Sequence, residues 1–176
     1  MTARPLVMRH PPVASQPGLC YGRLDPGLGP GWETAADALL PGLADRGAVI
    51  ASPAPRCLAP ARRLASALDL PLSVDARFRE LDFGAWEGRP WAEIPRAESD
   101  PWAEDPENRA PPGGETFAAM RARVADAWAD AAAVPAPLIL THAGAIRALR
   151  MALGGRGFAD AFATPVPHLT PLDPAA

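Results

Sequence analysis

Four basic or imidazole side chains in this sequence follow short apolar runs, a pattern that places them near the ends of strands. They are Arg9 and His10 after the first run, Arg56 after the second and His142 after the last. Two guanidinium groups and two imidazoles brought together would bind a tetrahedral dianion, because charge-assisted hydrogen bonds supply both energy and orientation. Phosphate is the dianion that suits this set of side chains.

A phosphoryl group held in this way can be attacked in line by a neutral imidazole nitrogen, while the arginines balance the charge on its equatorial oxygens. We predict that His10 is this nucleophile. A carboxyl group must then protonate the leaving alkoxide and later deprotonate the hydrolytic water, which requires a partly desolvated setting. The candidates are Glu80, Asp82 and Glu87, in one aromatic-rich segment. Glu80, which is flanked by aromatic residues, suits the role best.

The elements that must position these side chains are predicted from apolar periodicity and from proline stops. Strands are predicted at residues 5–8, 48–52, 72–74 and 138–140. Helices are predicted at residues 34–44, 59–68, 90–97, 117–133 and 145–153, with Pro60 in the first turn of the second helix. In open α/β sheets, ligands bind at the carboxyl ends of the strands. We therefore expect a single domain over residues 1–176, a three-layer α/β/α sandwich with a mainly parallel central sheet.

One turn and one loop complete the predicted site. The turn Thr141-His142-Ala143-Gly144 joins a strand to a helix, so backbone amides and the positive end of the helix dipole face whatever His142 faces. Residues 12–30 are dense in glycine and proline and form a loop over the end of the first strand. Within that loop, residues 20–25 place an aromatic, a glycine and a charge pair close together, which favours a lid on the substrate side.

The sequence indicates no function for three features of the chain. Residues 101–112 form an acidic segment bounded by prolines, and the chain after residue 154 predicts at most one additional edge strand. His168 lies in that last region and has no partner that the sequence identifies.

Composition excludes several classes of partner. The net charge is −3, the isoelectric point is near 5.6 and no dense basic run occurs, which argues against binding to nucleic acid or to an anionic membrane. The longest apolar region, residues 131–149, contains prolines, His142 and Arg147, so it does not resemble a membrane span. Cys20 and Cys57 match no metal-ligand spacing and favour a reduced, cytoplasmic protein. Whether the chain forms a homodimer is left open.

In order and spacing, the motifs resemble those of the histidine phosphatase superfamily, which has the phosphoglycerate-mutase-like fold. Arg9-His10-Pro11 matches its Arg-His-Gly signature, and residues 52–56 match its Ser-Pro-x-x-Arg segment. Residues 79–84 resemble the segment that carries its acid, and residues 141–144 resemble its Thr-His-Gly-Gly turn. The resemblance covers almost the whole chain, and four motifs in sequence are specific where any one alone would be weak.

The resemblance implies a phosphohistidine at His10 and a proton donor at Glu80, with no metal and no other cofactor. It also implies a phosphate pocket formed by the side chains of Arg9, Arg56 and His142 and the backbone amide of Ala143.

Residues 20–25 and 83–90 resemble the α-ribazole phosphatase branch of cobalamin synthesis. This resemblance implies a small phosphorylated substrate such as α-ribazole 5′-phosphate, with Tyr21, Gly22 and Arg23 on its substrate side. Related segments also occur in general phosphomonoesterases of the same fold.

The sequence also raises four alternative functions. Pro11 replaces the signature glycine and removes one backbone amide, which is compatible with a weak or inactive pseudo-phosphatase that binds phosphorylated ligands. A phosphoglycerate-mutase-type phosphoryl transferase is disfavoured, because the chain is short. A metal hydrolase using His10, His142 and His168 lacks the usual ligand spacing, and Arg9 would repel a cation. A serine hydrolase is weaker still, because Ser52 lies in no nucleophile-elbow pattern.

Overall fold

A four-stranded parallel sheet organises the chain in a computed structural model that describes residues 4–175. Its strands are β1 (Leu6–Arg9), β2 (Ala48–Ala51), β3 (Leu72–Val74) and β4 (Pro137–Thr141), in the order β1-β4-β2-β3. Each predicted strand is confirmed to within a residue or two. Arg9 pairs with Thr141, so the carboxyl ends of β1 and β4 are level, and His10 and His142 leave the sheet side by side.

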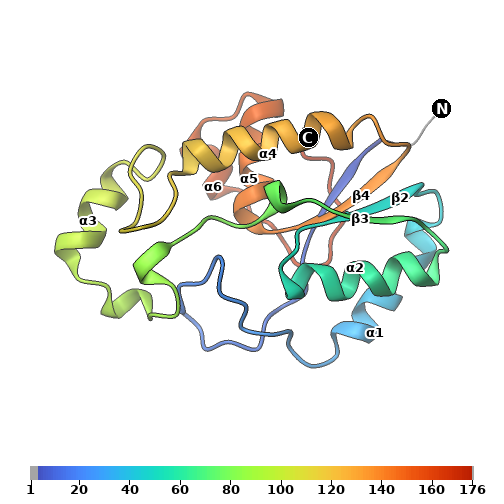
Figure 1. The fold of residues 1–176 in the computed structure, drawn as a ribbon, viewed down its shortest axis with the longest axis horizontal. Helices are drawn as coiled ribbons and strands as arrows, with labels where there is room; N and C mark the ends of the chain where they lie inside the picture. Colours follow the sequence, from blue (N-terminus) through green and yellow to red (C-terminus); the bar gives the residue numbers. More distant parts are fainter. Residues whose placement is uncertain (1–3, 176) are drawn as a thin grey trace.

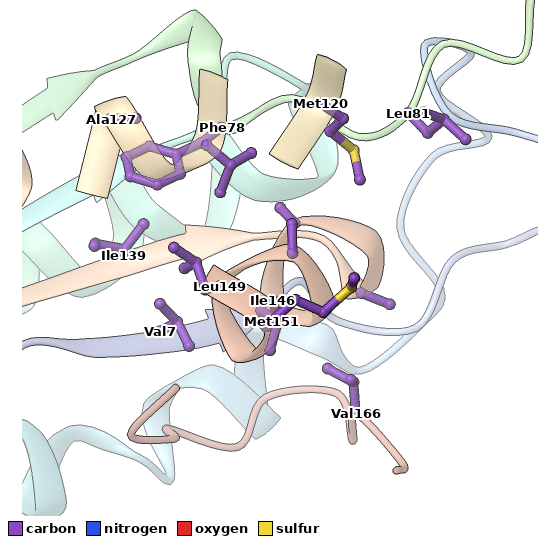
Figure 2. Close-up of a cluster of buried hydrophobic side chains, with 14 of the residues drawn as sticks. Val7, Phe78, Leu81, Met120, Ala127, Ile139, Ile146, Leu149, Met151 and Val166 are labelled. Carbon is purple, nitrogen blue, oxygen red and sulfur yellow. The ribbon is translucent and has the colours of Figure 1, made fainter. Parts of the chain in front are cut away.

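Helices cover both faces of the sheet, which confirms the three-layer arrangement (Figure 1). One face is covered by α4 (Phe117–Ala131) and α5 (Ala143–Gly154), and the other by α1 (Trp32–Asp37) and α2 (Pro55–Ala67). Strand residues alternate between the two cores because successive side chains point to opposite faces. Val7 and Ile139 belong to one buried cluster with Ile146 and Leu149 of α5 (Figure 2), whereas Met8 packs against the α1 and α2 side.

Two helix predictions in the first half of the chain are wrong in their bounds. The helix expected at residues 34–44 ends at Asp37 and is followed by a 3-10 helix, η1 (Leu40–Leu43). Pro41 and Gly42 interrupt it, since proline lacks an amide donor and glycine has low helix propensity. The second helix, α2, begins at Pro55, so Pro60 lies inside it rather than in its first turn. Arg56 therefore belongs to the first turn of α2.

The middle of the chain contains more helix than expected. The region predicted at residues 90–97 is a short 3-10 helix, η4 (Trp91–Glu93), followed by α3 (Arg96–Glu104), which takes in the start of the acidic segment. Two other 3-10 helices, η2 (Ala76–Phe78) and η3 (Gly84–Trp86), flank the segment that carries Glu80. In Figure 1, α3 lies beyond the carboxyl ends of the strands, away from the three layers.

The last part of the chain also departs from expectation. α5 begins two residues earlier than predicted, which makes His142 its N-cap residue, and a short helix, α6 (Phe158–Ala163), follows it. No further edge strand forms among residues 155–175; the backbone of this tail pairs with β1 only at isolated bridges, Val7–Leu172 and Arg9–His168. The four prolines of this tail cannot donate to a ladder, which explains why pairing stays local.

None of the helices between residues 4 and 175 is both long enough and apolar enough to cross a membrane.

Candidate active site

His10 is held in one orientation directly after β1. Its backbone N–H donates to the Thr141 carbonyl at 3.0 Å, and its ring Nδ1 donates to the Pro11 carbonyl at 2.7 Å. Because a carbonyl oxygen only accepts, Nδ1 carries the proton and the lone pair of a neutral ring lies on Nε2. Pro11, although it lacks an amide, thus supplies the acceptor that orients the predicted nucleophile.

The surroundings of His10 keep its imidazole neutral. The side chain is only 2% exposed, and this burial lowers the pKa of His10 from 6.5 to about 3, with the positive charges of Arg56 and Arg9 acting in the same direction. The hydrogen bond to Pro11 opposes the shift but is outweighed. A neutral imidazole is the form that can attack phosphorus.

His142 lies behind His10 at the amino end of α5. The two rings are 5.4 Å apart between centroids, and His142 is fully buried, which lowers its pKa well below the usual value. Its Nε2 shares a hydrogen bond of 2.9 Å with the Ser52 hydroxyl at the end of β2. Ser52 thus orients the second histidine. The strand-end position of Ser52 was the sequence signal that could have indicated this contact.

Arg56 is fully buried in the first turn of α2 and is bound by the loop at residues 20–25. Its Nη1 donates to the Leu24 carbonyl at 2.9 Å and to the Asp25 carboxylate at 3.0 Å, and its Nη2 donates to the Gly22 carbonyl at 2.6 Å. Its guanidinium also lies 5.3 Å from the centre of the Tyr21 ring. The sequence did not indicate the role of Asp25, which fixes this arginine through a charge-assisted hydrogen bond.

Two buried N–H groups remain unpaired at the predicted phosphate pocket. Arg9 donates through Nη1 to the Val166 carbonyl at 2.9 Å, yet its Nε, like that of Arg56, has no hydrogen-bond partner within residues 4–175. Buried donors are normally satisfied, so the unpaired Nε–H of Arg9, a residue that lines the same cavity as His10, indicates a place for an anion.

Glu80 sits against the amino end of α5. Its carboxylate accepts hydrogen bonds of 3.1 Å from the backbone N–H groups of Leu81 and Gly144. A Cβ at position 144 would overlap this carboxylate, so only glycine allows the close approach. Ala143, in the same turn, is buried and lines the same cavity as Glu80.

The other two candidate carboxylates point elsewhere. Asp82 accepts from the Gly84 N–H at 2.9 Å. Glu87 accepts from the backbone N–H groups of Gly22, Arg23, Leu24 and Phe83, so it ties residues 22–24 to the segment that follows Glu80. Of the three carboxylates, Glu80 is the one that lines the cavity described next.

A cavity of about 290 Å³ opens beside His10. Among the predicted site residues, its wall includes Arg9, His10, Tyr21, Glu80 and Ala143. Arg56 and His142 add no surface to it, because both are completely covered, so direct phosphate contact by these two remains a prediction.

Gly22 and Arg23 do not line this cavity, so their contact with the substrate remains a prediction. They border a smaller pocket of about 120 Å³ that Glu80 also lines. The Arg23 guanidinium lies 3.7 Å from Asp82 and 3.8 Å from Glu115, and Gly22 is pressed against the Leu81 carbonyl. These contacts give both residues a role in holding the loop.

Two residues near His10 were missed by sequence reasoning. His168 donates from Nδ1 to the His10 carbonyl at 2.6 Å, and its ring lies 5.4 Å from that of His10. Arg147, on α5, lines the cavity with its guanidinium 4.8 Å from the centre of the Phe162 ring. No local motif marks His168, which is 158 residues from its partner.

A comparison with protein-family models shows which superfamily includes this chain. The model of the histidine phosphatase superfamily (branch 1) matches residues 6–172. The chain belongs to this superfamily. The histidine phosphatase fold predicted from the four motifs is thereby confirmed.

The chain is also similar to individual proteins and to solved structures. The bifunctional protein Rv2228c of Mycobacterium tuberculosis is 40% identical over 121 residues, which cover 65% of this chain and 33% of that protein. An uncharacterised protein of Mycobacterium bovis matches with the same values. The chain thus spans a third of the length of the curated relatives that it matches.

Two solved structures illustrate the likeness in fold. The α-ribazole phosphatase of Shigella flexneri is 25% identical, with a TM-score of 0.83 and coverage of 94% of this chain and 86% of that chain. A mycobacterial glucosyl-3-phosphoglycerate phosphatase is 28% identical, with a TM-score of 0.76 and coverage of 93% and 85%. Both relatives are named as phosphatases, so phosphatase chemistry is the common feature.

Within residues 4–175, no group of three or more His, Cys, Asp or Glu side chains is arranged to hold a metal ion. Both cysteines are free and buried, and burial raises the pKa of the Cys57 thiol beside His142.

We expect His10 to remain neutral where an exposed histidine titrates. Its pKa is about 3 in the folded protein and 6.5 without the burial, so unfolding takes up a proton below pH 6.5. The contribution of the buried, neutral His10 to the free energy of unfolding is therefore complete above pH 6.5. It is lost progressively as the pH falls from 6.5 toward 3, because protonation then favours the unfolded state.

Nitrogen NMR of histidine-labelled protein tests this expectation between pH 8 and pH 5, with the His10 signals assigned by their absence in His10→Asn. The Nε2 shift should stay at the value of an unprotonated nitrogen throughout. A titration midpoint near the ordinary value would show that the imidazole is not desolvated.

Proposed function

We propose that this protein is a metal-independent phosphomonoesterase that hydrolyses a small phosphorylated metabolite through a phosphohistidine at His10. The observation that carries the proposal is the neutral His10 imidazole, with its Nδ1 proton bound to the Pro11 carbonyl. This arrangement leaves the lone pair on Nε2 in a side chain that lines the same cavity as Glu80.

In the first step, His10 Nε2 attacks phosphorus, the N–P bond forms and the ester P–O bond breaks. The Glu80 carboxyl group gives its proton to the leaving alkoxide. In the second step, a water gives a proton to the Glu80 carboxylate and its oxygen attacks phosphorus, while the N–P bond breaks and its electron pair returns to Nε2. The positive charges of Arg9 and Arg56 stabilise the phosphoryl oxygens in both steps.

We propose α-ribazole 5′-phosphate as the substrate. Residues 20–25 and 83–90 resemble the corresponding segments of that branch, and the Shigella flexneri enzyme shares the fold over 94% of this chain. Under this proposal the protein acts in the cytoplasm, in cobalamin biosynthesis.

Phosphate release from α-ribazole 5′-phosphate, 3-phosphoglycerate and p-nitrophenyl phosphate, each with EDTA present, tests the proposal. We expect turnover that EDTA does not reduce, with the highest kcat/KM for α-ribazole 5′-phosphate. Loss of activity in EDTA would indicate a metal enzyme. Binding of phosphate without any release would indicate a pseudo-phosphatase, and transfer of the phosphoryl group to a second site on phosphoglycerate would indicate a mutase.

A further inference from the structure

Beyond its catalytic end, the cavity beside His10 has an aromatic wall. The wall is assembled from the loop over β1, from residues 83–91, from α3, and from α4 and α6. The aromatic residues that contribute to it are Tyr21, Phe83, Trp91, Trp102, Phe117, Phe158 and Phe162. We call this part of the cavity the aromatic chamber.

Two stacked pairs of rings belong to the chamber. Trp91 and Trp102 lie 5.9 Å apart at an angle of 25°, and Phe158 and Phe162 lie 4.1 Å apart at 18°. Trp91 and Phe162 are also 38% and 37% exposed, which is high for large apolar side chains. Flat apolar surfaces that remain accessible at the mouth of a concave site favour a flat apolar ligand.

Two donors in the wall of the chamber lack acceptors. The indole N–H of Trp102 and the Nε–H of Arg147 are buried and have no hydrogen-bond partner within the described residues. Both residues line the cavity. Because buried donors are normally satisfied, a ligand in the chamber is expected to bring acceptor atoms with its apolar surface.

The same wall is poorly suited to a highly hydroxylated sugar or to glycerate. Apart from the predicted site residues, Arg147 is the one charged side chain among those that line the cavity. A polyhydroxylated group would lose its hydration against tryptophan and phenylalanine rings without gaining enough partners in return.

We infer that the chamber receives the leaving-group side of the substrate, and that this part is a flat heteroaromatic ring bearing hydrogen-bond acceptors. Trp102 and Arg147 are then specificity-determining residues. The inference rests on the proposed function and extends it, because it assigns the recognition of the ring to residues outside the four phosphatase motifs.

A matched pair of substrates isolates the contribution of the ring. α-Ribazole 5′-phosphate and ribose 5-phosphate release phosphate from the same primary alcohol of ribose, but only the first carries a heteroaromatic base. We expect wild-type kcat/KM to favour the first by about 100-fold, and Trp102→Leu to reduce this ratio about tenfold. Trp32→Leu is the matched control, since Trp32 packs on the opposite face of the sheet and should leave the ratio unchanged.

Binding of the dephosphorylated product separates the inference from the proposed function. Calorimetric titration with α-ribazole should give a Kd that is about tenfold weaker for Trp102→Leu than for wild type, whereas ribose should not bind measurably. Equal hydrolysis of the two phosphates would overturn the inference while leaving the phosphatase proposal intact. If neither phosphate is hydrolysed, the proposed function fails, and the titration alone then decides whether the chamber binds the ring.

Discussion

His10→Asn is expected to reduce phosphate release at least a thousandfold and to abolish covalent labelling of the protein. The asparagine side chain keeps a polar group near the Pro11 carbonyl, to which His10 Nδ1 donates at 2.7 Å, but has no Nε2 to attack phosphorus. The measurement is incubation with ³²P-labelled substrate, followed by alkaline quenching, since phosphohistidine survives base, and by mass spectrometry of the labelled peptide.

His168→Asn is the matched control for that experiment. The His168 ring is as close to His10 as the His142 ring is, with 5.4 Å between centroids in each case, but it does not line the cavity. The variant should still carry the label on the peptide that contains His10. A label on another histidine, or wild-type turnover by His10→Asn, would refute the proposed nucleophile.

Glu80→Gln is expected to lower the turnover of α-ribazole 5′-phosphate by about 100-fold to 10,000-fold, because the amide has no proton to give to the leaving alkoxide. p-Nitrophenolate leaves without protonation, so the first step with p-nitrophenyl phosphate should be affected much less. The second step still needs the carboxylate to accept a proton from water. We therefore expect one equivalent of p-nitrophenolate in a rapid burst, followed by slow turnover with accumulated phosphoenzyme.

Asp82→Asn provides the comparison for Glu80→Gln, because Asp82 lies two residues away but bonds to the Gly84 N–H and does not line the cavity. It should retain steady-state turnover without a burst. Vanadate affinity measured in parallel should be similar for both variants, since neither change removes a positive charge. Unchanged kinetics in Glu80→Gln, with a loss in Asp82→Asn, would assign the acid to Asp82.

The residues at the catalytic end of the site could be predicted from the sequence because each of them lies in a local sequence pattern. Arg9 and His10 follow a short apolar run that ends at prolines, and His142 follows another run that opens into a helix. The carboxyl ends of the strands in a parallel sheet meet at one edge, so local sequence patterns were enough to predict that these residues lie close together. The strands of the structure agree with those predictions to within a residue or two.

Helix bounds were less predictable, and the errors have a common physical basis. Proline at the first position of α2 starts the helix early, and Pro60 is then tolerated inside it because packing against the sheet outweighs the loss of one hydrogen bond. At the other end of the chain, prolines limit the tail to isolated bridges with β1.

The sequence alone thus determined the fold class and the residues at the strand ends, whose positions follow from short-range periodicity. Only the tertiary structure decided that Asp25 binds Arg56, that His168 donates to His10 and that seven aromatic residues from separate segments form one chamber. These contacts join residues up to 158 positions apart. Their formation depends on how helices and loops pack over the sheet, which no local pattern encodes.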